Sequence, residues 1–146
     1  MNIFNHYLLV LIIFFSVFCS IQDIKNLAVS NWILLIANIS VLFFQLFFNK
    51  NDILWVVLSG ILYFVFYYLV RLFTKKKLGM ADVYFGMLQG FCIRISLLPV
   101  CVLAECLFVS LLILIKPEFR TKKIPFIPFM AAALILTYLA SFILPF

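Results

Sequence analysis

The chain has 146 residues, of which 68% are hydrophobic and 11% are charged, and its formal net charge is +6. A water-soluble domain is about half apolar and about a quarter charged, so this composition excludes a soluble fold and predicts that lipid surrounds most of the chain. The basic residues cluster in short connections between apolar runs. This pattern favours anionic headgroups and the setting of membrane topology over nucleic-acid binding.

The apolar runs predict membrane-spanning helices. A helix needs about 20 residues to cross the hydrocarbon core, and backbone in lipid must satisfy its hydrogen bonds internally. The runs are too long and too uniformly apolar for barrel strands. We therefore expect an all-α, polytopic membrane bundle of six transmembrane helices that forms a single domain over residues 1–146. The expected helices are Ile3–Ile21, Trp32–Phe48, Ile53–Phe73, Ala81–Leu97, Leu98–Ile115 and Phe126–Leu144.

Two of these segments differ from the rest. The first has no basic n-region and no small-x-small cleavage site, and polar Gln22-Asp23 follows it, so we interpret it as a retained span and not as a signal peptide. The fourth is only modestly apolar and contains Gly86, Gln89, Gly90 and Arg94. We expect the fourth helix to be packed inside the bundle or to span only part of the membrane.

The basic residues predict the orientation. With six spans, successive connections alternate between the two sides of the membrane. One side receives nine basic residues, and the other receives Lys50 and Arg94 together with both termini. The nine are Lys25, Arg71, Lys75, Lys76, Lys77, Lys116, Arg120, Lys122 and Lys123. The positive-inside rule puts these nine in the cytoplasm, so both termini should face outward.

Two carboxylates are the main candidates for chemistry. Asp23 follows the first apolar run and Asp82 lies at or near the first turn of the expected fourth helix, so both fall at the expected cytoplasmic boundary. Each alone could be ordinary, as a solvated interfacial Asp beside Lys25 or as a helix N-cap. Ionisable groups at such depths are nevertheless costly and are functional candidates. Gly79 allows a backbone shape that other residues resist, and Ala81 allows close helix approach.

Together the two aspartates predict a catalytic dyad. Two carboxylates a few ångströms apart share a proton, so that one can activate water while the other polarises a carbonyl. This is the chemistry of aspartic peptidases. Because Asp82 begins a helix and Asp23 ends one, the helix dipoles favour Asp82 as the ionised partner and Asp23 as the protonated one.

Three segments resemble a known family, the type IV prepilin peptidases. Asp23 with Asn31 eight residues later resembles their D-x6-P-N signature, although Ser30 stands in place of the proline. The run from Gly79 to Asp82 resembles their G-x-G-D signature, with Ala81 in place of the second glycine and Tyr84 where many members have lysine. Ile-Pro-Phe-Ile-Pro at residues 124–128 is similar to the segment that often opens their last helix.

The resemblance implies an aspartic endopeptidase of the bacterial or archaeal cytoplasmic membrane. Such an enzyme removes the cytoplasmic, basic leader from prepilin or pseudopilin precursors, with Asp23 and Asp82 matching the family's catalytic pair. The chain lacks the cysteine-containing insert of longer, bifunctional members, so the resemblance implies a peptidase-only form without zinc or S-adenosylmethionine. Residues expected to support the pair or the substrate backbone are Gln22, Asn26, Asn31, Gly79 and Ala81.

Other polar groups leave alternatives open. The four cysteines, Cys19, Cys92, Cys101 and Cys106, lack metal-ligand spacing, so we expect no metal site. Glu105 lies within the fifth apolar run, where a charge costs about 3 kcal/mol. We favour a structural polar contact for Glu105 over protonation alone, pairing with Arg94 or a place near the site.

Two other functions fit the same residues. One is a small ion- or proton-coupled transporter with Asp23, Asp82 and Glu105 along its path, which predicts ion flux in proteoliposomes. The other is a catalytically inactive pilin-assembly subunit, which predicts binding of a precursor without cleavage.

Overall fold

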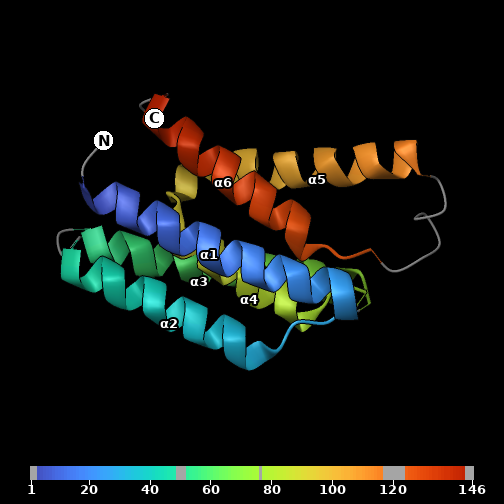
Figure 1. Cartoon of the computed structure of the whole chain (residues 1–146), viewed down its shortest axis with the longest axis horizontal. Coiled ribbons are helices and arrows are strands. Elements are labelled where there is room, and N and C mark those ends of the chain that lie inside the picture. Colours follow the sequence, from blue (N-terminus) through green and yellow to red (C-terminus); the bar gives the residue numbers. More distant parts are fainter. Residues whose placement is uncertain (1–2, 49–51, 76, 117–123, 144–146) are drawn as a thin grey trace.

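The computed structural model describes residues 3–48, 52–75, 77–116 and 124–143, and in these ranges the chain folds into helices joined by short connections (Figure 1). Five of the basic residues that predict the orientation lie outside the described residues: Lys50, Lys76, Arg120, Lys122 and Lys123. The helices are α1 (Ile3–Asn26), α2 (Asn31–Phe48), α3 (Ile53–Phe73), α4 (Met80–Cys92), the 3-10 helix η2 (Ile95–Leu97), α5 (Leu98–Ile115) and α6 (Ile127–Ile143).

Four helical segments are long and apolar enough to cross a membrane, and they comprise most of α1, the whole of α2 and α3, and η2 with α5. Large apolar side chains cover their outer faces, with Leu54 81% exposed and Leu114 76% exposed. A face of this kind is stable in lipid and not in water. The chain is therefore an all-helical, multi-pass membrane protein.

The six-span expectation is met only in part. α6 is a shorter apolar helix, and α4 has 13 residues. A helix of that length is about 20 Å long, against a hydrocarbon core of about 30 Å. The expected fourth helix, Ala81–Leu97, is thus wrong in its length, because the chain leaves the α-helix after Cys92 and continues as η2.

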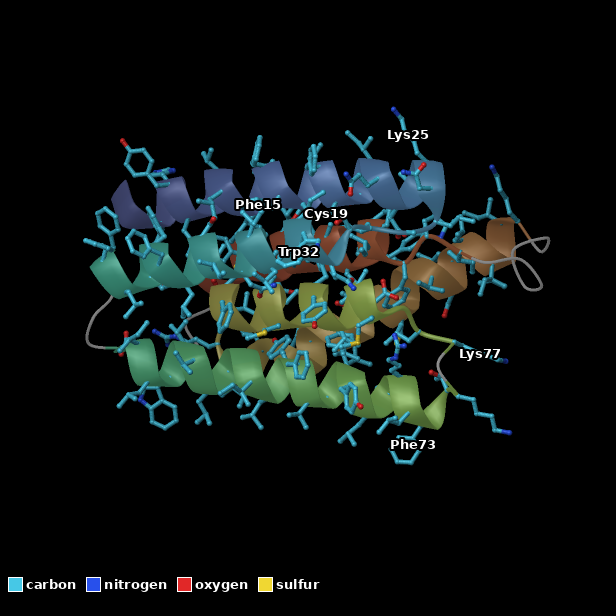
Figure 2. All side chains as sticks on the ribbon, turned by 90° about the horizontal axis from the view of Figure 1, so that it is seen from below. Phe15, Cys19, Lys25, Trp32, Phe73 and Lys77 are labelled. Atoms are coloured by element: carbon cyan, nitrogen blue, oxygen red, sulfur yellow. The ribbon has the colours of Figure 1, made fainter. Side chains whose placement is uncertain are left out.

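α4 occupies the interior of the bundle. It lies between α2 and α3 in Figure 2 and also contacts α6. Nine of its 13 residues are buried, including Gln89 and Gly90. Its contact with α3 is close because a Cβ at Gly90 would lie 2.7 Å from the Gly60 Cα atom. The expectation that this segment is packed inside the bundle is in agreement with the structure.

Side chains of the neighbouring helices hold α4 in place. Asn38 of α2 donates a hydrogen bond to the Tyr84 carbonyl at 3.1 Å, and Gln45 of α2 donates one to the Phe91 carbonyl at 3.0 Å. Ser59 of α3 donates to the Ile93 carbonyl at 3.1 Å. Carbonyls at a helix end have no partner within the helix, and within a membrane they need one. Gln45 and Ser59, which bond the carbonyls at the C-terminal end of α4, let the helix end inside the protein.

The other predicted boundaries differ from the structure by a few residues, with one difference that matters. α1 continues to Asn26, five residues beyond the expected end at Ile21. Asp23 therefore lies in the last turn of the helix and not beyond it. The hydrophobic run marks where the lipid contact ends, whereas the helix continues into the polar residues that follow.

Candidate active site at one end of the bundle

Three helix ends meet at one end of the bundle: the C-terminal end of α1 and the N-terminal ends of α4 and α6 (Figure 1). Lys25 and Lys77 lie at this end in Figure 2. The two candidate aspartates come from two of these helix ends, with Asp23 in the last turn of α1 and Asp82 in the first turn of α4.

Asp82 is held by the backbone that begins its own helix. Its Oδ2 atom accepts a hydrogen bond from the Gly79 N–H at 2.8 Å, which is half of a capping box. The side chain is 8% exposed and lies outside the four candidate spans. Burial raises the pKa of Asp82 to about 7, the Gly79 N–H opposes this shift, and the negative charge of Asp23 adds to it.

The signature residues before Asp82 adopt ordinary backbone conformations. Gly79 has φ −66° and ψ 155°, and neither it nor Ala81 has a positive φ. The expectation that Gly79 supplies an unusual backbone shape is therefore wrong. What distinguishes Gly79 is space, because a Cβ there would lie 3.0 Å from Oδ2 of Asp82. Ala81 is the second residue of α4, where alanine fits the helix without strain.

Asp23 is held by a different helix. It is 7% exposed, and its Oδ2 atom accepts a hydrogen bond from the Ile127 N–H at 3.0 Å. The backbone N–H of Phe126 also bonds to this carboxylate. Asp23 thus meets the N-terminus of α6, where the helix dipole favours negative charge. Hydrogen bonds to the charged form of a carboxylate favour that form.

Asp23 and Asp82 lie within electrostatic range of each other, because the charge of Asp23 shifts the pKa of Asp82. The two carboxylates come from residues 59 positions apart, and each is buried and bonded to a backbone N–H. Two buried carboxylates that feel each other's charge do not titrate independently.

The three polar residues that the sequence suggests as supports lie on α1 and α2. Gln22 is half-buried on α1, and Asn26 is exposed at the end of that helix. Asn31 is exposed at the start of α2 and lines a surface pocket together with Trp32 and Tyr84.

Arg71 is a site residue that sequence reasoning missed. It lies in the last turn of α3, and its Nη1 atom donates a hydrogen bond to the Leu78 carbonyl at 3.2 Å. Arg71 thereby braces the connection that leads to Gly79, and its positive charge lowers the pKa of Asp82. In the sequence it was indistinguishable from the other basic residues of the same connection.

Glu105 belongs to a separate buried cluster. It is 1% exposed and accepts hydrogen bonds from the Tyr67 hydroxyl at 2.6 Å and from Gln89 Nε2 at 2.7 Å. Gln89 also donates to the Met130 carbonyl at 3.0 Å, so the cluster joins α3, α4, α5 and α6. The expected structural polar contact of Glu105 is consistent with these bonds.

Among the described residues, no three His, Cys, Asp or Glu side chains are grouped as a metal site would need. All four cysteines are free thiols, and only Cys106 is exposed.

A scan against protein-family models matches residues 9–115 to the type IV leader peptidase family. Neither a search of curated proteins nor a search of solved structures found a match. The matched range includes Asp23 and Asp82 and ends before α6. Because it covers well over half of the chain, the protein belongs to the type IV leader peptidase family.

Proposed function

We propose that this protein is a membrane-embedded aspartic endopeptidase that removes the leader peptide from type IV prepilin or pseudopilin precursors, with Asp23 and Asp82 as its catalytic pair. The observation that carries the proposal is the pair itself. Two buried carboxylates from α1 and α4 lie within electrostatic range of each other, and each accepts a hydrogen bond from a backbone N–H. The family match supports the reaction class.

In the proposed mechanism Asp23 is the ionised partner and Asp82 the protonated one. This reverses the assignment drawn from the sequence, which considered only the C-terminus of α1 and not the N-terminus of α6. Burial disfavours charge on both aspartates, which are 7% and 8% exposed, but Asp23 has two backbone N–H donors whereas Asp82 has one. Burial favours the neutral form of Asp82, whose pKa is raised to about 7. A coupled pair titrates as a unit, so the roles describe its dominant protonation state.

The chemistry follows from these roles. The Asp23 carboxylate takes a proton from a water molecule as that water attacks the scissile carbonyl carbon. The Asp82 carboxyl donates its proton to the carbonyl oxygen, which gives a neutral tetrahedral intermediate. Collapse of the intermediate breaks the C–N bond while the amine nitrogen gains a proton from Asp23 and a hydroxyl proton returns to Asp82. The products are the leader acid and the mature amine, and the pair returns to its starting state.

The proposed topology has six spans, with the short α4 counted as a partial one, both termini outward and the active site on the cytoplasmic side of a bacterial or archaeal cytoplasmic membrane. The distribution of basic residues supports this orientation. Lys25 and Lys77 lie at the same end of the bundle as the helix ends that carry the aspartates (Figure 2). A precursor with a cytoplasmic leader followed by an apolar helix would present its junction at this depth.

The test is coexpression of the wild-type protein, Asp23→Asn or Asp82→Asn with a type IV prepilin precursor, followed by measurement of leader removal. Asparagine keeps the size and the acceptor oxygen of aspartate but cannot exchange a proton. We expect processing by the wild type and none by either variant. Full processing by either variant, or precursor binding without cleavage by the wild type, would refute the proposal. The second outcome would favour the inactive assembly subunit.

A further inference from the structure

The start of α6 carries a contact that the family match does not cover. The matched range ends at residue 115, whereas Phe126 and Ile127 lie at the beginning of α6. Ile127 is 1% exposed and its N–H bonds to Oδ2 of Asp23, 104 positions earlier in the chain. The Ile-Pro-Phe-Ile-Pro segment therefore meets the candidate active site in space.

The two prolines give this segment an unusual set of donors. Proline has no backbone N–H, so among residues 125–128 only Phe126 and Ile127 can donate from the backbone. Both of these N–H groups go to Asp23. The next N–H, that of Phe129, is taken by the Phe126 carbonyl at 3.1 Å. A helix start normally leaves several backbone N–H groups without a partner in the helix. At the start of α6 only those of Phe126 and Ile127 remain, and both bond to the Asp23 carboxylate.

We infer that the Phe126 and Ile127 backbone N–H groups are a positioning element for catalysis, which orients Asp23 and stabilises its charge for water activation. The inference rests on the proposed function, since it gives the start of α6 a role in that same reaction. These groups act through Asp23 and do not touch the substrate. The start of α6 is thereby required for the activity of a site whose two carboxylates lie on α1 and α4.

The charged surroundings of Asp23 make the effect measurable. α1 packs against α2 and α6, whose described residues include no Asp, Glu, His, Lys or Arg. The titratable groups coupled to Asp23 are Asp82 on α4 and the Cys19 thiol one turn earlier on α1, while Lys25 is exposed beside it. None of these groups is altered by a change at Ile127.

The decisive comparison is Ile127→Pro against Ile127→Val in purified protein acting on a prepilin precursor. Ile127 is the first residue of α6, a position where proline is well tolerated. Proline removes the backbone N–H donor, whereas valine keeps this donor and has a side chain of similar size. We expect the proline variant to have a kcat about 10- to 100-fold below that of the valine variant. The acid limb of its pH–rate profile should lie about one pH unit higher than that of the valine variant.

A second variant keeps the inference falsifiable if the proline variant does not fold. An ester in place of the Phe126–Ile127 peptide bond removes the same N–H and keeps the isoleucine side chain. It should lower kcat and move the acid limb in the same direction. Equal kcat and equal acid limbs in the folded proline or ester variant and the valine variant would overturn the inference alone. Absence of cleavage by the wild type would instead refute the proposed function, and the inference with it.

Discussion

Gly79→Ala separates the catalytic geometry from the stability of the fold. The backbone at Gly79, with φ −66° and ψ 155°, is one that alanine adopts freely, and the residue is exposed. The new Cβ atom would lie 3.0 Å from Oδ2 and 3.7 Å from Cγ of Asp82. Because carbon and oxygen need more room than that, the Asp82 carboxylate must move by several tenths of an ångström.

The size of the effect follows from what that movement disturbs. Weakening the 2.8 Å bond between the Gly79 N–H and Asp82 costs about 1 kcal/mol of stability. A displacement of about 1 Å in a reacting group can cost about 100-fold in rate. We therefore expect Gly79→Ala to fold and melt close to the wild type but to cleave a prepilin precursor at least about tenfold more slowly.

The assay is the initial rate of leader removal by purified protein in lipid, with the melting temperature measured on the same samples. Ala81→Gly is the matched comparison, because it restores the family signature at a position where the helical backbone already accepts alanine. It should lose less activity than Gly79→Ala. A wild-type rate for Gly79→Ala, or a larger loss for Ala81→Gly, would refute the reasoning.

Three further predictions concern stability, each measured by melting in detergent. Burial raises the pKa of Asp82 to about 7, so its ionisation destabilises the folded state as the pH rises from about 4 to 7. At pH 8, but not at pH 4, Asp82→Asn should therefore melt at a higher temperature than the wild type, with a free energy of unfolding larger by a few kcal/mol at most, about 1.4 kcal/mol for each unit of pKa shift. Gly90→Ala should cost about 1–3 kcal/mol, because its Cβ would meet rigid backbone of α3. Glu105→Ala should cost about 3 kcal/mol by leaving the Tyr67 hydroxyl and its neighbours without an acceptor, and Glu105→Gln should cost less.

Two of the long apolar helices could be predicted from the sequence residue by residue. The expected ranges Ile53–Phe73 and Leu98–Ile115 are those of α3 and α5. In both cases charged residues or a proline mark the ends of the apolar run, so the hydrophobic segment and the helix end at the same residues. The short α4 was harder to predict, because its end depends on donors such as Gln45 and Ser59 from other helices.

The candidate site could be predicted in its residues but not in its electrostatics. The spacing of Asp23 and Asp82 around the apolar runs put both carboxylates at one boundary. The sequence could not show that Asp23 meets the start of α6, since that contact depends on how α1 and α6 pack. Only the packing reveals which carboxylate has two backbone donors, and the proposed protonation of the pair rests on that difference.

The central claim is that Asp23 and Asp82 together activate water for leader removal. The most direct measurement is the mass of the products formed by purified protein in liposomes from a prepilin precursor, in water enriched with the heavy oxygen isotope. We expect a leader whose new carboxylate carries one heavy oxygen, and no product with Asp23→Asn or Asp82→Asn. A labelled leader formed at the wild-type rate by either variant would contradict it.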